Sequence, residues 1–316
     1  MTKILLVKLM VKVKHKNMKW PCMMCYNEKS TSFIQTILFY SDIRGVAIAG
    51  VEGEPVNLTE LVAEAIATAF AAWLLNKKKA DGLRRLRISV GHDSRISAHK
   101  LQNAITHGIT AAGHDVLQFG LASTPAMFNS TLTEDAINHC PADGGIMITA
   151  SHLPYNRNGF KFFTSDGGLN KTDIKDILER ASKVYEESAH CGKQEQTGVV
   201  THVDYMSIYA SDLVQAVRKS AGNKEKPLEG LHIVVDAGNG AGGFFVDKVL
   251  KPLGAVTDGS QFLEPDVIRQ TWASYLILML TGAKITIEIL HMRNNINVKN
   301  LLIFAGQLLL IPVDVS

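Results

Sequence analysis

A serine, a histidine and a lysine that lie within one short stretch could together carry out phosphoryl-group chemistry. Ser151 and His152 directly follow an apolar run, and Lys161 stands ten residues further on. A serine hydroxyl is a weak nucleophile unless its neighbours assist it, and a lysine can neutralise phosphate charge or transfer a proton. Pro154 and Gly159 favour a stiff turn that folds the lysine back toward the serine. The stretch predicts a nucleophile at the mouth of a buried strand, against the alternative of a capping serine in an ordinary loop.

The elements that must position this stretch follow from the helix and strand signals after residue 41. Buried strands are expected at residues 86–90, 116–119 and 145–148. The strands alternate with helices, so the pattern predicts an α/β fold in which a mixed, mostly parallel sheet is sandwiched by helices. Ligands of such sheets bind beyond the carboxyl ends of the strands. Ser151 and the loop 91–95 both fall at such ends.

The helices are read from caps and apolar spacing. Asn57 and Glu60 form a capping box that is expected to open a helix ending in the run 77–79. Ser97 is expected to cap the next helix, which stops at Gly113. Further helices are expected to start at Thr124-Pro125 and to span residues 171–187.

Polar residues 189–200 mark the expected boundary between two domains. The first domain is placed at 41–190 and a partial second domain at 200–266, with a helix near 204–220 and a strand at 231–235. The two ends of the chain differ from this pattern. Residues 1–40 form an atypical basic leader, with six lysines and no acidic residue in the first 27, and residues 267–316 form an atypical apolar tail.

Composition excludes several classes of function. The net charge of +3 is small and the basic residues are spread along the chain, so we expect no nucleic-acid partner and a small ligand if the ligand is anionic. The most apolar stretch, 272–290, contains Lys284 and Glu288, which argues against a membrane span. The sequence leaves the oligomeric state open.

Cysteines and histidines do not predict a metal or redox site. Cys22 and Cys25 have CxxC spacing, but no second pair accompanies them. Reduced thiols indicate an intracellular protein of the cytoplasm or a plastid rather than a secreted one. Four histidines are expected to be solvated or capping residues rather than metal ligands: His92, His99, His107 and His114.

Five segments between residues 41 and 266 resemble, in the same order, the α-D-phosphohexomutase superfamily (phosphoglucomutase/phosphomannomutase). Each segment alone is a weak signal, whereas five in order are specific. They are Ser41–Gly45, Gly91–Arg95, Gly120–Pro125, Thr149–Lys161 and Asp236–Gly242. The resemblance implies the fold of phosphohexomutase domain I followed by an incomplete domain II.

The resemblance also implies a reaction and its residues. Ser151 would carry a phosphoryl group and exchange it with a hexose phosphate through a hexose bisphosphate, interconverting the 1- and 6-phosphates. One phosphoserine oxygen would bind Mg²⁺. Lys161 and His152 would assist proton transfer and charge stabilisation, while Arg44 and Arg95 would support the electrostatics of the active site. Phosphoryl transfer depends mainly on positioning and charge neutralisation, so this set of cations is chemically reasonable.

The resemblance stops after Asp266. The family's metal-binding Asp-Gly-Asp-x-Asp-Arg string and its third and fourth domains have no counterpart, and Mg²⁺ requires several oxygen ligands. We therefore expect a truncated chain that is inactive alone. The alternative is a non-catalytic fragment that keeps the fold of the first domain and binds a partner or phosphate.

A glycine-rich segment offers a different alternative. Gly238-x-Gly240-x-x-Gly243 follows an expected strand, and Asp258 lies twenty residues after Gly238, which fits the spacing of a dinucleotide-binding fingerprint. The motif is weak by itself, and it coincides with the fifth segment of the phosphohexomutase resemblance. NAD binding is therefore the least favoured reading.

Overall fold

The computed structural model describes most of residues 42–260 and little outside them. Described are residues 38–39, 42–78, 85–135, 140–151, 153–188, 197–233, 235, 237, 240–258 and 260, and two strands at 301–304 and 307–310. His152, the CxxC pair, nearly all of the expected leader and most of the expected tail lie outside these residues.

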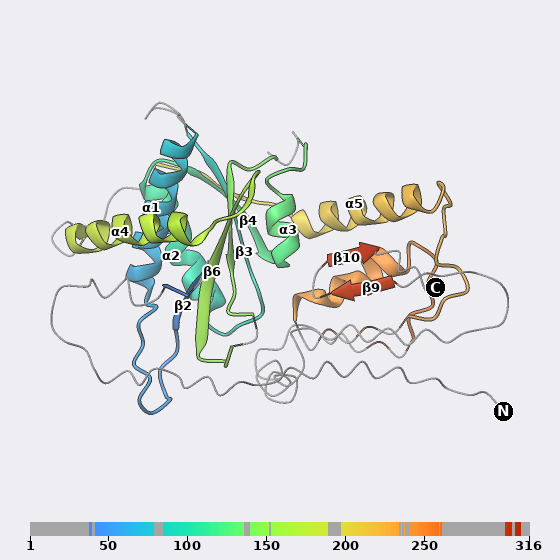
Figure 1. Ribbon diagram of the computed structural model, residues 1–316, viewed down its shortest axis with the longest axis horizontal. Coiled ribbons are helices and arrows are strands. Elements are labelled where there is room, and N and C mark those ends of the chain that lie inside the picture. The colour runs from blue at the N-terminus through green and yellow to red at the C-terminus, as the bar shows by residue number, and fades with distance from the viewer. Residues whose placement is uncertain are drawn as a thin grey trace.

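One mixed sheet organises the first part of the chain (Figure 1). Four neighbouring strands, β5, β3, β4 and β8, run parallel, while β6 is antiparallel to both β5 and β2. The mostly parallel α/β fold expected from the sequence is confirmed. In sheet order the strands are β1 (Leu38–Phe39), β2 (Asp42–Val46), β6 (Arg157–Thr164), β5 (Gly144–Ile148), β3 (Arg87–His92), β4 (Asp115–Leu121) and β8 (Val200–His202), with β7 (Gly167–Gly168) paired to β6.

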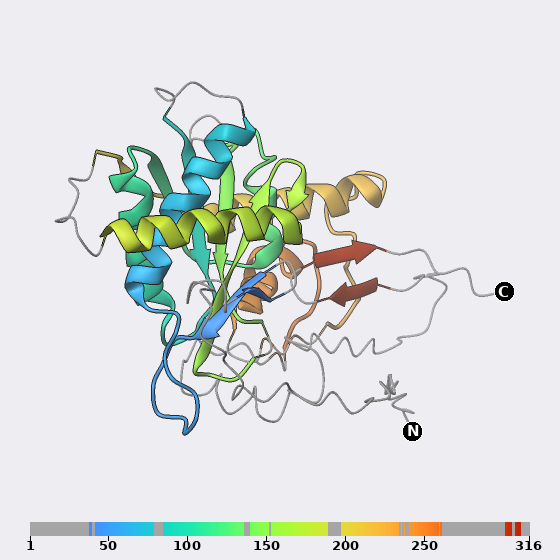
Figure 2. The ribbon, with the colours of Figure 1, turned by 60° about the vertical axis from the view of Figure 1, so that its left-hand side comes forward.

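Helices cover both faces of the sheet, as Figures 1 and 2 show. One face carries α1 (Glu60–Lys77), α2 (Ala98–Ala111) and α4 (Lys171–Ser188), and the other carries α3 (Thr124–Asn129) and the start of α5 (Tyr205–Ser220). The first core is aromatic where α1 meets β6, with the Phe70 and Phe162 rings 4.8 Å apart. In the second core Phe119 stacks on Tyr205 at 4.5 Å.

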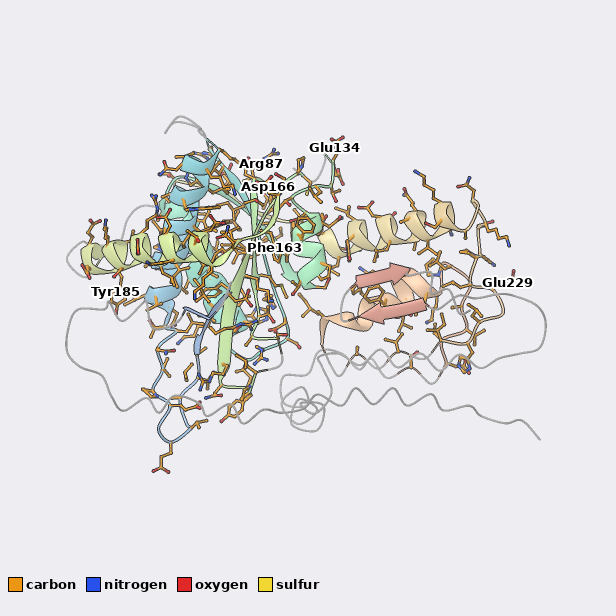
Figure 3. The ribbon with its side chains drawn as sticks, viewed as in Figure 1. Arg87, Glu134, Phe163, Asp166, Tyr185 and Glu229 are labelled. Atoms are coloured by element: carbon orange, nitrogen blue, oxygen red, sulfur yellow. The ribbon has the colours of Figure 1, made fainter. Side chains whose placement is uncertain are left out.

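Strand β6 presents different side chains to the two faces. Phe160 and Phe162 are buried in the core beneath α1 and α4. Phe163 packs on the opposite face, where its ring lies 6.1 Å from that of Phe128 in α3 (Figure 3). Because successive strand residues point to opposite faces, Lys161 shares the face of Phe163.

The helix positions agree with the sequence, but two caps do not. Thr59 caps α1 by accepting a hydrogen bond from the Val62 amide at 3.3 Å, whereas the Asn57 side chain accepts from the Val46 amide at 2.7 Å. Ser97 stands at the start of α2 without a side-chain cap, because its hydroxyl accepts a hydrogen bond from the Asn158 side chain at 2.8 Å. Both polar residues tie a helix start to the sheet instead of capping it.

The chain from residue 197 to 260 is less regular. Helix α5 begins after Asp204, which accepts a hydrogen bond from the Ser207 amide at 3.2 Å. Among the described residues of the strand expected at 231–235, His232 forms an isolated parallel bridge with Val256, and residue 234 lies outside the described residues. A 3₁₀ turn (Ala241–Gly243) and a π-helix (Val246–Leu250) follow, and β9 (Leu301–Phe304) pairs antiparallel with β10 (Gln307–Leu310). No helix among the described residues has the length and apolarity to cross a membrane.

Candidate active site at the serine loop

The serine loop, defined here as residues 149–157, follows the carboxyl end of β5, on the side of the sheet where the parallel strands end. Ser151 is exposed there and has a φ of 57°, one of two positive values among the described non-glycine residues. The left-handed conformation costs an L-amino acid roughly 1–2 kcal/mol, so it persists only where the surroundings enforce it. A strained serine at the end of a parallel strand is therefore a candidate functional residue.

Arg95 fixes the backbone of this loop through hydrogen bonds to its carbonyl groups. Its guanidinium donates hydrogen bonds of 2.8–3.0 Å to four loop carbonyls, those of residues 151, 153, 154 and 157. Its Nε also lies 3.3 Å from the Asp93 carboxylate. Burial lowers the pKa of Arg95, and the charge of Asp93 opposes that shift. The family resemblance implied an electrostatic role for Arg95, and its hydrogen bonds to the loop carbonyls give it a structural one.

Two further residues complete this arrangement and were not predicted from the sequence. The Thr149 hydroxyl accepts a hydrogen bond from the Ser151 amide at 2.9 Å and donates one to Asp93 Oδ2 at 2.7 Å. Asp93 also accepts from the Arg95 amide at 3.1 Å. Asp93, Arg95 and Thr149, called here the clamp, thus grip Ser151 at both its N–H and its carbonyl. The polar strand ends could have suggested them, because the carboxyl ends of β3 and β5 meet at this edge.

Arg44 and Lys161 bring positive charge to the loop from β2 and β6. Arg44 donates to the Thr149 carbonyl at 3.0 Å and to Asp42 at 2.9 Å, and Lys161 lies 3.2 Å from the same Asp42 oxygen. The side chain of Arg44 is 10% exposed and that of Lys161 27% exposed. Asp42, Arg44 and Lys161, called here the cation side, carry a net positive charge.

A glycine makes room for Arg44. A Cβ placed on Gly159 would lie 2.1 Å from the Ile43 carbonyl oxygen and 2.8 Å from Arg44 Cδ. Any side chain at this position would therefore push β2 away from β6. Gly159 permits the close approach that carries the Arg44 side chain across β6 to the loop.

Glu54 ties the outer end of the serine loop to the segment before α1. Its two carboxylate oxygens accept hydrogen bonds from the side chains of Asn156 at 2.6 Å and Arg157 at 2.7 Å. The hydrogen bond from Asn156 is the main cause that lowers the pKa of Glu54. No short-range pattern predicts this contact, because its partners are more than a hundred residues apart in the sequence.

The folded unit that carries this site has recognisable relatives. Residues 38–188, from β1 to the end of α4, match the family model described as phosphoglucomutase/phosphomannomutase, alpha/beta/alpha domain I. Over these residues the chain matches domain I of the phosphohexomutase superfamily. The serine loop, the clamp and the cation side all lie within the residues that match this domain.

Two curated relatives show how much of a phosphohexomutase the chain represents. It is 34% identical over 198 residues to a phosphoglucosamine mutase of Nautilia profundicola, covering 63% of the chain and 41% of the relative. It is 32% identical over 207 residues to a phosphoglucomutase/phosphomannomutase of Thermococcus kodakarensis, covering 66% of the chain and 41% of the relative. The chain thus spans about two fifths of the length of these relatives.

A solved structure agrees with this assignment. The crystal structure of a phosphoglucomutase/phosphomannomutase family protein from Burkholderia thailandensis aligns with a TM-score of 0.57 and 25% identity, covering 79% of this chain and 46% of that one. The shared fold extends beyond the 151 residues (38 to 188) of domain I.

Four of the five site residues predicted for the phosphohexomutase reaction lie around the serine loop: Arg44, Arg95, Ser151 and Lys161. The fifth, His152, lies outside the described residues, as do Asp236, Gly238 and Asn239 of the glycine-rich segment. Of the four histidines predicted to be solvated or capping, His92 and His99 do meet, with ring centroids 4.6 Å apart. Within the described part of the chain, however, no three His, Cys, Asp or Glu residues gather as a metal site.

Proposed function

We propose that Ser151 is the phosphoryl carrier of a hexose-phosphate mutase. It accepts a phosphoryl group from a hexose bisphosphate and passes one to a hexose phosphate, so that hexose 1-phosphate and hexose 6-phosphate interconvert. The proposal is carried by one observation: an exposed serine is held in a left-handed conformation at a strand end, where Arg44 donates to the adjacent Thr149 carbonyl and shares Asp42 with Lys161. The match to domain I of a superfamily of mutases supports it.

The transfer to Ser151 exchanges one phosphate ester for another. The serine Oγ forms a bond to phosphorus while the bond from phosphorus to the hexose oxygen breaks, and the hydroxyl proton ends on that oxygen. Arg44 and Lys161 would neutralise the charge on the transferring group, which is the main contribution a protein makes to phosphoryl transfer. Lys161 is half-buried and shares Asp42 with Arg44, so it can turn from that carboxylate to an arriving phosphate. Lys161 and His152 stay our predicted proton-transfer residues.

Magnesium is the cofactor that the superfamily resemblance implies, with a phosphoserine oxygen as one ligand. Mg²⁺ needs several oxygen ligands in near-octahedral geometry. The carboxylates nearest the loop are already engaged: Asp42 by Arg44 and Lys161, Asp93 by Arg95 and Thr149, and Glu54 by Asn156 and Arg157. The described residues therefore do not fit a magnesium site of their own, and the steps above use only side chains of the chain.

A phosphorylation experiment tests the carrier role directly. The full chain is incubated with glucose, mannose or glucosamine 1,6-bisphosphate, with and without Mg²⁺, and the phosphoserine is located by peptide mass spectrometry. We expect one phosphate on Ser151, and none on the Ser151→Ala variant. A wild-type chain that stays unphosphorylated with all three donors, or a label that persists within residues 149–161 of the variant, would refute the proposal. The preferred donor would identify the hexose.

A second candidate is a non-catalytic module that binds phosphate without transferring it. The absence of a carboxylate cluster among the described residues favours it. The two functions differ in outcome: a binding module would bind glucose 6-phosphate reversibly in calorimetry and leave Ser151 unmodified. We expect little steady-state mutase turnover from this chain in either case, measured as glucose 6-phosphate formed from glucose 1-phosphate.

The compartment belongs to the same proposal. Cys140 is a free thiol that is buried, and burial raises its pKa to about 11. An unpaired thiol is ordinary in a reducing environment, which supports the cytoplasm or a plastid. Imaging of a fluorescent fusion would test this, and a secreted fusion would contradict it.

A further inference from the structure

We infer that Thr149 and Asp93 are positioning residues: they fix the left-handed backbone of Ser151 and thereby aim its hydroxyl. The inference rests on the proposed carrier role of Ser151. It adds two residues that do not touch the phosphoryl group and act through the serine backbone. Both residues are largely buried, with Thr149 4% and Asp93 9% exposed, so neither is readily available to a ligand in solution.

The direction of each hydrogen bond follows from the chemistry of the groups. A carboxylate can only accept, so the contact of 2.7 Å requires the Thr149 hydroxyl to donate its one proton to Asp93. The lone pairs of the same hydroxyl then face the Ser151 amide, which donates at 2.9 Å. Asp93 thus orients the threonine hydroxyl, and the threonine in turn holds the serine.

Arg95 closes the arrangement from the other side of the peptide. It donates to the Ser151 carbonyl at 3.0 Å, and its Nε lies 3.3 Å from the Asp93 oxygen that receives the threonine proton. The two ends of Ser151 are therefore fixed by groups that meet at one carboxylate. A residue held in this way can keep a left-handed φ that its own side chain disfavours.

The fixed backbone of Ser151 determines how its hydroxyl is oriented for attack on phosphorus. Among the described residues no side chain forms a hydrogen bond with the Ser151 hydroxyl, so its direction is set by the left-handed backbone. Attack on phosphorus requires that hydroxyl in line with the bond that breaks, and a misplacement of about 1 Å can slow such a step by about 100-fold. Loss of the Thr149 hydroxyl should therefore slow the phosphorylation of Ser151 while the chain still folds.

Two substitutions at the same position separate positioning from packing. Thr149→Val keeps the shape and removes the hydroxyl, while Thr149→Ser keeps the hydroxyl and removes a methyl group. We expect Thr149→Val to form phosphoserine from the preferred bisphosphate up to about 100-fold more slowly. Thr149→Ser should stay near the wild-type rate.

A matched control is Thr110→Val in α2. Thr110 is fully buried, and its hydroxyl donates to helix carbonyls far from the serine loop. This variant should phosphorylate at the wild-type rate. A Thr149→Val chain that is as fast as wild type, or a Thr149→Ser chain that is as slow as Thr149→Val, would overturn the inference.

A second measurement separates this inference from the proposed function. The exchange rate of the Ser151 amide, followed by NMR, reports its hydrogen bond to Thr149 whether or not the chain accepts phosphate. We expect exchange to accelerate roughly twofold to tenfold in Thr149→Val and not in Thr149→Ser, as the net strength of one hydrogen bond implies. If the wild-type chain is never phosphorylated, the carrier function fails, and the amide exchange alone decides the positioning role. An unchanged rate in Thr149→Val would then refute it.

Discussion

Both sides of the serine loop carry a basic residue paired with an aspartate, but the basic residues have different roles on the two sides. On the clamp side, every hydrogen bond donated by the Arg95 guanidinium goes to a backbone carbonyl of the loop, and the side chain is 5% exposed. On the cation side, Arg44 and Lys161 share one carboxylate, and Lys161 is 27% exposed. The sequence alone grouped both arginines as electrostatic residues. The structure separates an arginine that shapes the site from a pair of cations that can meet a ligand.

This difference shows that a cation beside the serine loop need not be available to bind an anion. Arg95 would have to abandon four carbonyls to reach a ligand, which would leave buried acceptors unsatisfied. Lys161 has only to exchange Asp42 for a stronger anion. The clamp side should therefore determine stability and geometry, while the cation side should determine the affinity for anions.

The largest expected difference between the clamp side and the cation side is in the stability lost when Arg95 or Arg44 is replaced. We expect Arg95→Met to lower the free energy of unfolding by roughly 3–5 kcal/mol, because it leaves Asp93 as a buried charge without its partner. Arg44→Met should cost about 1–2 kcal/mol, since the Asp42 carboxylate keeps Lys161. Urea-induced unfolding followed by circular dichroism measures both.

Arg85→Met supplies the control for losing an arginine. Its side chain is 48% exposed and pairs with Asp115 at the surface, so we expect a change within about 0.5 kcal/mol. Equal losses for Arg95→Met and Arg44→Met would remove the distinction between the two sides of the loop.

A smaller effect is expected at Ser151 itself. Glycine adopts a positive φ without steric cost, so Ser151→Gly should be more stable than Ser151→Ala by about 1 kcal/mol. Asn223, with a φ of 61° in a turn, should show a similar difference between glycine and alanine. Introducing Thr149→Val should reduce the stability difference between the Gly and Ala variants at Ser151. The same difference at Asn223 should stay unchanged, because the clamp holds only the Ser151 backbone. Thermal unfolding of the eight variants, four with and four without Thr149→Val, would measure both differences.

The fold was largely predictable because it depends on local signals. Apolar strands, capped helices and their alternation indicated the parallel sheet, and the strand expected at 145–148 is β5 with one more residue. The antiparallel strand β6 was not predicted. Its pairing with β2 joins residues more than a hundred positions apart, which no local pattern records. Of the strand expected at 231–235, the described residues show a single parallel bridge, from His232 to Val256.

The candidate site was predictable in its residue types but not in its connections. Ser151, Lys161 and Arg44 were predicted by residue type and motif, and Arg44 contacts the Thr149 carbonyl and shares Asp42 with Lys161. Asp93, Thr149, Asp42 and Glu54 were missed because each acts through a partner from a different segment. Sequence patterns indicate which residues could do chemistry, whereas the hydrogen bonds that position them require the folded chain.

The smallest expected effect is a dependence of stability on pH that involves both His92 and His114. His92 Nδ1 lies 2.6 Å from the Asp93 carbonyl, which can only accept, so Nδ1 carries the proton and the neutral ring leaves Nε2 bare. His114 Nδ1 instead accepts a hydrogen bond from the Leu86 amide at 3.3 Å and must be unprotonated. Burial is the main cause that lowers the pKa of both rings below the usual 6.5.

The sign of the effect follows from these shifts. Below about pH 6.5 the unfolded chain binds protons at these histidines more readily than the folded chain does, so the free energy of unfolding falls as the pH drops. Urea unfolding at pH 7.5, 6.5 and 5.5 should show this loss. His92→Gln and His114→Gln should each flatten it, whereas His202→Gln, at an exposed position of β8, should not. His92→Gln could leave the pH dependence of the unfolding free energy unchanged while His114→Gln removes it. The histidine responsible would then be His114 and not His92, the neighbour of Asp93 in the clamp.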